Sequence, residues 1–207
     1  MITTTYKAFF NRVFEPPARV LVRCGVTPNL LTLAGLLLGL LCCLFLILTR
    51  RVALFCLLIT AAMLCDALDG AVARVSGRAT PLGAYLDAMA DRYVEAAVAL
   101  AVAYVTGYWV LSLIVLAGSF GISYAKARAA MEVPIANNAW PDWMERAGRG
   151  ALFLLGLLLS AVVPWRPLGR DLFWWTLVLL AVATHATVMQ RMLRARRIIQ
   201  ARAASPD

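Results

Sequence analysis

The sequence is poor in charge and in histidine. Asp, Glu, Lys and Arg make up 15% of its 207 residues, whereas 62% are hydrophobic, and the mean hydropathy is +0.79. This balance excludes an ordinary soluble domain and predicts one polytopic domain in a membrane. The only histidine, His185, lies in a late apolar stretch, where a hydrogen bond between helices explains it better than catalysis.

No two cysteines form a C-x-x-C pair, and most of them lie in apolar stretches, so a cysteine-based metal or disulfide centre is not expected. Packed or lipid-facing thiols are the simpler interpretation. No cleavable signal peptide is evident either, because about thirty residues of mixed sequence precede the first apolar run. The five cysteines are Cys24, Cys42, Cys43, Cys56 and Cys65.

Acidic residues are also scarce, with 11 against 20 basic ones, which gives a net charge of +9. The basic residues flank apolar segments and form no continuous stripe, so membrane topology and anionic headgroups explain them better than nucleic acid does. If the chain crosses the membrane six times, both termini share one side. The other side then has only four basic residues, which leaves sixteen of the twenty beside the termini. We therefore expect a multi-pass protein of the cell (inner) membrane with both termini in the cytoplasm. The four exceptions are Arg50, Arg51, Arg166 and Arg170.

The apolar runs predict an all-α integral membrane fold of six transmembrane helices. Thr27-Pro28-Asn29 marks the start of the first span, although Asn29 could be only a helix cap. Gly107 marks a later turn, and residues 131–144 are expected to form an exposed loop. The spans are expected at about 30–48, 52–75, 81–105, 108–130, 145–163 and 171–193.

Residues 5–24 mix aromatic and basic residues and are too polar to span. They predict an interfacial amphipathic helix, broken at Pro16-Pro17. The expected organisation is an N-terminal interfacial helix (1–26), a six-helix catalytic domain (27–193) and a basic cytoplasmic tail (194–207).

Four aspartates lie within the apolar sequence between residues 66 and 91. Each costs about 2.5–3.5 kcal/mol near the centre of a membrane helix. Asp66 and Asp69 are i,i+3 neighbours and Asp87 and Asp91 are i,i+4 neighbours, so each pair lines one helix face. Such carboxylates suit Mg²⁺ or Mn²⁺, and two ions about 3.5–4 Å apart are typical of displacement at phosphorus. A turn that includes Gly77, Thr80, Pro81 and Gly83 would bring the two pairs together.

A structural alternative is that these aspartates pair with arginines inside the membrane, which neutralises charge without requiring this spacing. The candidate partners are Arg74, Arg78 and Arg92. An EF-hand does not fit, because its loop alternates oxygen ligands and ends in a glutamate.

The pattern Asp66-x-x-Asp69-Gly70-x-x-Ala73-Arg74, eight residues, then Gly83-x-x-x-Asp87-x-x-x-Asp91 resembles the signature of the CDP-alcohol phosphotransferase family. The resemblance implies two divalent ions held by Asp66, Asp69, Asp87 and Asp91, with Asp91 also the general base. It further implies a homodimer. The CDP-lipid would contact Asn29, Thr32, Asp69, Gly70, Ala73, Arg74 and Gly83. For the small residues, close helix packing is an equally good explanation.

Four further cations are expected near the cytoplasmic level and suit a phosphate on the acceptor. They are Lys126, Arg146, Arg149 and Arg191, in the segments SYAKARA, MERAGR and VMQR. These segments resemble the phosphatidylinositol-phosphate synthase branch of the family, although Ala147-Gly148 stands where that branch often has Pro-Glu. Ordinary inside-positive charge remains the alternative.

The resemblance implies transfer of the phosphatidyl group of CDP-diacylglycerol to a phosphorylated alcohol, with release of CMP. Inositol 1-phosphate is the favoured acceptor, and glycerol 3-phosphate, free inositol or serine are alternatives. An ion or proton transporter would use the aspartates differently, but we see neither the inverted repeat nor the broken helix typical of transporters. A non-catalytic scaffold does not need four membrane carboxylates.

Overall fold

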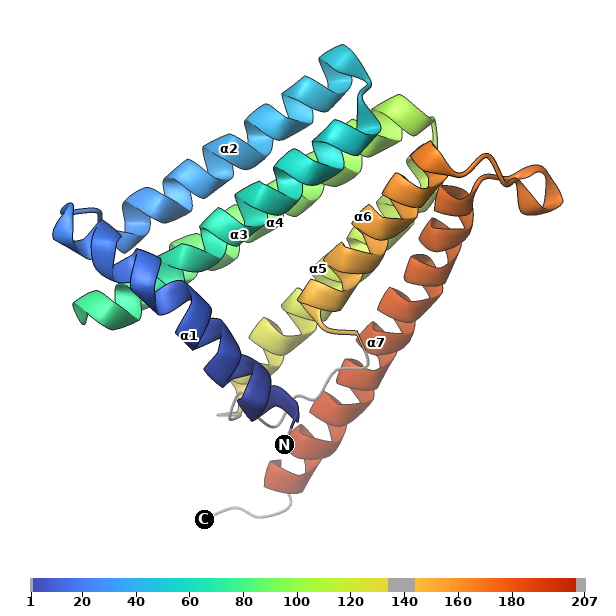
Figure 1. The fold of residues 1–207 in the computed structure, drawn as a ribbon. Helices are drawn as coiled ribbons and strands as arrows, with labels where there is room; N and C mark the ends of the chain where they lie inside the picture. The colour runs from blue at the N-terminus through green and yellow to red at the C-terminus, as the bar shows by residue number, and fades with distance from the viewer. Residues whose placement is uncertain (1, 134–143, 204–207) are drawn as a thin grey trace. The chain divides into compact units, whose positions relative to one another are not determined.

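A computed structural model describes residues 2–133 and 144–203 of the chain, and all regular structure in these residues is helical (Figure 1). Each predicted span corresponds to one helix, and the helix ends lie within a few residues of the expected ones except in the last helix, which continues ten residues beyond the expected end at 193 into the segment expected as a tail. The helices are α1 (Ile2–Arg23), α2 (Pro28–Thr49), α3 (Val52–Ser76), α4 (Pro81–Thr106), α5 (Trp109–Glu132), α6 (Arg146–Val162) and α7 (Leu172–Ala203), with a 3₁₀ turn, η2 (Pro167–Gly169).

Four of these helices, α2, α3, α5 and α7, are long and apolar enough to cross a membrane. Helix α6 has only 17 residues, shorter than the roughly 20 residues that a span needs. Helix α4 is long enough, but its 26 residues include two aspartates, an arginine and a glutamate. The described residues therefore define an all-helical protein with four candidate spans.

The loops agree with the sequence in most places. Thr27 is the N-cap of α2, with its hydroxyl accepting a hydrogen bond from Leu30 N at 3.3 Å. The interpretation of Asn29 as the cap is therefore wrong. Gly77 ends α3 in the left-handed conformation at φ 65°, and Gly107 turns the chain at φ 78°, where a residue with a Cβ would be strained.

Two turn predictions need correction. Gly83 lies in the first turn of α4, not in the connection before it, and its N–H donates to the Thr80 hydroxyl at 3.0 Å. Helix α5 continues to Glu132, into the segment expected as a loop. The rest of that expected loop, from 134 to 143, lies outside the described residues.

The chain divides into two compact units, residues 1–101 and 102–207. In the first unit α3 packs against both α1 and α2. Gly39 of α2 allows close approach of α4, because a Cβ there would lie 3.1 Å from the Val94 side chain. Small residues at such contacts let membrane helices pack through their backbones.

Helix α1 is continuous through Pro16 and Pro17, so the predicted break there is wrong. Proline removes a backbone donor, but its fixed φ of about −65° is compatible with a helix. The helix is also held from the side, because Ala18 is fully buried in a small core with Ala71 and Val72 of α3. Packing here offsets the lost hydrogen bonds.

In the second unit α7 packs against α5 and α6. A Cβ at Gly118 would lie 2.3 Å from the Thr184 hydroxyl oxygen, and one at Gly156 would lie 2.2 Å from that of Thr176. Both glycines are therefore required by helix contact. The hydrogen bond of His185 is also different from the one expected, because Nδ1 lies 2.9 Å from the Ala181 carbonyl of its own helix.

Candidate active site

Three of the four aspartates converge in the first unit. Asp66 and Asp69 of α3 and Asp87 of α4 each place a carboxylate oxygen within 4.8 Å of the others. Asp69 is 8% exposed and the other two are half-buried. Two oxygens bound to one Mg²⁺ at 2.0–2.1 Å lie at most about 4.2 Å apart, so a small rotation of the side chains would let all three bind one ion. This donor set fits a hard divalent cation.

Asp91 lies one turn beyond Asp87 on α4, where the i,i+4 spacing places both residues on the same helix face. It is half-buried and lies outside the group of three oxygens within 4.8 Å of one another. Its role in a second metal position and as a base therefore stays a prediction.

Thr32 is positioned to orient one of the carboxylates. Its hydroxyl, on α2 and 6% exposed, donates to Asp69 Oδ2 at 2.6 Å. The contact joins residues 37 positions apart. When a neighbouring side chain donates a hydrogen bond to a metal-binding carboxylate, the bond fixes the rotamer of the carboxylate and the direction of its remaining lone pairs. The sequence resemblance placed Thr32 near the nucleotide, and the structure gives it this additional contact.

Gly35 is a site residue that sequence reasoning missed. A Cβ on this residue would lie 2.7 Å from Asp66 Oδ1 and 3.4 Å from Asp66 Cβ, so a larger residue here would displace that carboxylate. The available signal was the spacing Thr32-x-x-Gly35, which places both residues on one face of α2. That face contacts the α3 aspartates.

Asn29 and Gly83 also lie together. A Cβ on Gly83 would lie 3.1 Å from Asn29 Oδ1 and 3.2 Å from the Thr80 hydroxyl oxygen. The Asn29 side chain therefore faces the start of α4, where a bare backbone leaves its amide close to the helix. Both residues were predicted to contact the CDP-lipid, and the structure brings them to the same place.

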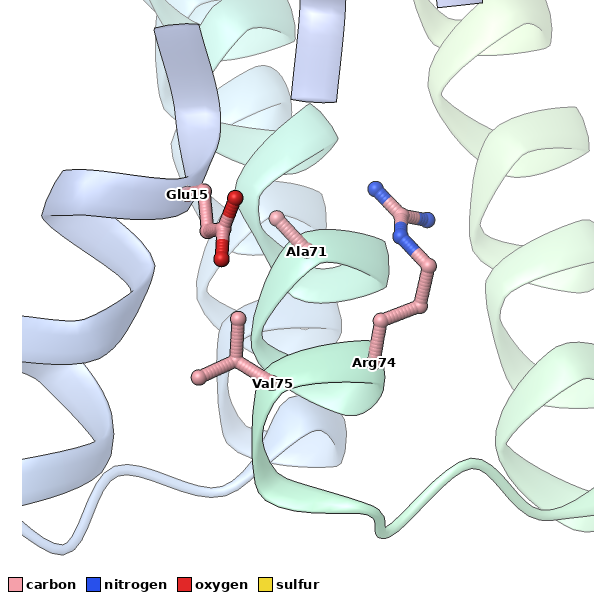
Figure 2. Close-up of a pocket in the computed structure, with 4 residues that line it drawn as sticks. All are labelled: Glu15, Ala71, Arg74 and Val75. Atoms are coloured by element: carbon pink, nitrogen blue, oxygen red, sulfur yellow. The ribbon is translucent and has the colours of Figure 1, made fainter. Parts of the chain in front are cut away.

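A pocket of about 230 Å³ opens beside the signature segment of α3 (Figure 2). It is lined by Ala71, Arg74 and Val75 of α3 and by Glu15 of α1. A Cβ on Gly70 would lie 3.4 Å from Arg74 Nη1, so the small residue at position 70 leaves this guanidinium at the helix surface. Glu15, which the sequence did not single out, forms an ion pair with Arg19 at 2.7 Å.

Arginine pairing with the aspartates was the alternative explanation for the acidic cluster. Arg92 forms an ion pair at 2.6 Å with Glu95 of its own helix, and both side chains are largely buried. Arg92 thus has a carboxylate partner within its own helix, and pairing of the other arginines with the aspartates stays an alternative.

The predicted acceptor cations lie in the second unit. Arg149 and Arg191 are 6% and 7% exposed, whereas Lys126 is half-buried and Arg146 is exposed. Arg191 Nη1 donates to the carbonyl of Ile122, one turn before Lys126 on the same face of α5. The contact thus brings Arg191 beside the helix turn that carries Lys126.

Arg149 is held from its own segment. Its Nη1 donates to the Met144 carbonyl at 3.0 Å, just before the start of α6. Buried guanidinium groups need hydrogen-bond partners or anions, because an isolated buried charge is very costly. Arg149 and Arg191 therefore differ from ordinary basic residues at helix ends, which are solvated.

The apolar helices indicate an integral membrane protein, and its all-oxygen carboxylate site is of the kind that binds divalent cations. The model of the CDP-alcohol phosphatidyltransferase family matches residues 25–186. The chain belongs to this family and is an enzyme of that class.

Similar proteins point in the same direction. The phosphatidylinositol phosphate synthase of Mycolicibacterium smegmatis is 33% identical over 90% of this chain and 85% of its own. The archaetidylinositol phosphate synthase of Pyrococcus horikoshii is 29% identical over 91% of this chain and 95% of its own.

Solved structures of the phosphatidylinositol phosphate synthase of Mycobacterium tuberculosis are similar as well. The structure with CDP-DAG bound has a TM-score of 0.78 and 32% identity, and the match covers 89% of this chain and 94% of that one. The complex with manganese and citrate has a TM-score of 0.77 and 31% identity, and covers 88% of each chain.

Proposed function

We propose that this enzyme transfers the phosphatidyl group of CDP-diacylglycerol to the hydroxyl of a phosphorylated alcohol, most simply inositol 1-phosphate, and releases CMP. The observation that carries the proposal is the convergence of Asp66, Asp69 and Asp87 within 4.8 Å in a chain of this family. CDP-DAG in one similar structure and manganese in another support the donor and the metal.

The four aspartates would hold two Mg²⁺ or Mn²⁺ ions, with Asp91 completing the second position. When bound, the ions neutralise the pyrophosphate and polarise the phosphorus that is attacked. Arg74 would offer a fork of donors to the phosphate oxygens. Asp91 would accept the proton of the attacking hydroxyl, as a general base must. The CDP-lipid site would comprise Asn29, Thr32, Asp69, Gly70, Ala73, Arg74 and Gly83.

The acceptor phosphate would be bound by Lys126, Arg146, Arg149 and Arg191. The burial of Arg149 and Arg191 supports this assignment, because a buried cation that meets a dianion recovers part of its desolvation cost. Serine and free inositol bring no phosphate and would leave the cluster unmatched. Glycerol 3-phosphate carries the same charge and is the second candidate.

We also propose that α4 and α6 cross the membrane, which gives six spans. The charges of α4 that weaken its membrane signal include Asp87 and Asp91, which the chemistry uses. The domain would then consist of residues 27–193, preceded by an interfacial helix (1–26) and followed by a basic tail (194–207). By the distribution of positive charge, the termini and the active site would face the cytoplasm, with the enzyme in the inner membrane. A homodimer is the expected assembly.

The proposal is tested with the purified full-length protein and CDP-diacylglycerol, with CMP release as the measurement. Inositol 1-phosphate, glycerol 3-phosphate, inositol and serine are compared in the presence of Mg²⁺. We expect release with inositol 1-phosphate, and its loss in EDTA and in Asp69→Asn. Preference for an unphosphorylated alcohol over its phosphate ester would refute the acceptor. Full activity in EDTA would refute the metal site.

A further inference from the structure

The connection between α6 and α7 presents an exposed leucine in a backbone conformation that leucine rarely adopts. Leu168 lies inside η2 with φ 52° and ψ 34°. Its side chain is 88% exposed, the largest fraction among the large hydrophobic residues of the described parts of the chain. A left-handed conformation is costly for any residue with a Cβ, and glycine would avoid that cost. An apolar side chain at this position therefore needs a reason.

The connection is a hydrogen-bonded turn and not a loose loop. Gly169 N donates to the Arg166 carbonyl and Arg170 N to the Pro167 carbonyl, both at 3.2 Å. The Trp175 indole N–H, on the first turn of α7, donates to the same Pro167 carbonyl at 3.1 Å. These bonds hold the turn against α7, so Leu168 is presented in a defined position.

Two arginines flank the leucine. Neither Arg166 nor Arg170 belongs to an ion pair among the residues that the structure describes. The nearby carboxylate of Asp171 is already engaged, since it accepts from the Tyr108 hydroxyl at 2.6 Å and from Trp174 N at 2.8 Å. The turn therefore combines an exposed apolar tip with two cations that have no acidic partner there.

The turn also lies at the end of a membrane span. Helix α7, a candidate span, begins at Leu172, and η2 precedes it directly (Figure 1). Trp165, on the other side of η2, is 64% exposed, and tryptophan is enriched at the membrane–water interface. Arg166 and Arg170 are two of the four basic residues that the positive-inside pattern leaves unexplained. Their position needs an attraction other than cytoplasmic topology.

We propose that residues 164–170 form an interfacial anchor that binds anionic phospholipid. Leu168 and Trp165 insert among the upper parts of the acyl chains, which removes exposed apolar surface from water. Arg166 and Arg170 bind lipid phosphates, whose geometry matches the guanidinium fork. Transfer of Leu168 into lipid offsets the strain of its backbone. The anchor is independent of the proposed reaction.

The test places a fluorescent label at the tip of the turn in the full-length protein. Leu168→Cys is made in a background in which the exposed Cys24 and Cys65 are alanine, and the protein is reconstituted in phospholipid vesicles. We expect strong quenching by brominated phosphatidylcholine and weak quenching by iodide. The same label at Gln200, an exposed position near the end of α7, is the matched control and should show the reverse. A label at position 168 that iodide quenches as readily as at 200 overturns the anchor.

The second arm measures lipid choice. Quenching of the label at 168 by brominated phosphatidylglycerol is compared with quenching by brominated phosphatidylcholine at equal content. Each arginine near an anionic surface should favour the anionic lipid about fivefold, so Arg166→Gln with Arg170→Gln should bring the preference close to one. Arg197→Gln, in the exposed polar part of α7, should leave it unchanged. Equal quenching by both lipids in the unsubstituted turn overturns the assignment of the arginines.

Discussion

The hydrogen bond from Thr32 to Asp69 gives a quantitative test of the metal site. Thr32→Val keeps the shape of the side chain and removes the hydroxyl that donates at 2.6 Å. A hydrogen bond to a charged group is worth about 1.5–3 kcal/mol, and loss of a supporting contact to a metal ligand typically costs about 10–100-fold in affinity. We therefore expect the apparent dissociation constant for Mn²⁺ to rise roughly 10- to 100-fold.

The measurement is Mn²⁺ titration of the purified protein, followed both as binding and as CMP release. Activity of Thr32→Val should recover at high Mn²⁺, because the ligands themselves are intact, and Thr32→Ser should resemble the unsubstituted enzyme. Thr60→Val is the matched control, since the Thr60 hydroxyl donates only to the Cys56 carbonyl one turn earlier, at 2.7 Å. An unchanged Mn²⁺ titration in Thr32→Val, or an equal change in Thr60→Val, would refute the role of Thr32.

Three further predictions follow from individual contacts. Gly35→Ala should displace the carboxylate it faces and lower kcat about tenfold or more, whereas Gly148→Ala, whose Cβ would meet nothing within 4 Å, should be tolerated. Arg149→Ala should raise KM for the phosphorylated acceptor roughly 10- to 150-fold and spare that of CDP-diacylglycerol. Arg197→Ala should change neither. Burial, then the hydrogen bond and charge of the neighbouring aspartate, raise the pKa of Tyr108 to about 12. The stabilisation it gives is therefore complete below the ordinary pKa of about 10 and is lost toward pH 12, so Tyr108→Phe should lower Tm at pH 8 and less so as the pH rises.

The helices and the approach of three aspartates were predictable because their signals are local. Apolar runs of membrane length predict helices whatever their neighbours do, and the i,i+3 and i,i+4 spacing of the aspartates fixes which face they share. Asp66, Asp69 and Asp87 do converge, whereas Asp91, predicted to join them, lies outside that group. The unbroken α1 was not predictable, because the packing of Ala18 that offsets two prolines involves α3, far away in the sequence.

The residues that sequence reasoning missed act across helices. Gly35 is required because Asp66 lies opposite it, and Gly118 because Thr184 does. A glycine in an apolar run is equally compatible with packing, with ligand approach and with neither. Only the position of the facing helix decides among them, and no periodicity in one sequence reports that position. The same limit explains why the hydrogen bond of His185 was assigned to the wrong helix.

The geometry of the aspartates also explains why the site depends on its surroundings. At an effective dielectric constant of 20, two unit charges 4.8 Å apart repel by about 3.5 kcal/mol, and three ionised carboxylates form three such pairs. Free rotation of the side chains would relieve this repulsion by moving the oxygens apart. The hydrogen bond from Thr32 to Asp69 opposes that rotation, and the missing side chain at Gly35 leaves the space into which the Asp66 carboxylate points. A divalent cation bound there would remove this electrostatic cost, so the residues that hold the carboxylates in place would contribute to metal affinity without binding the metal.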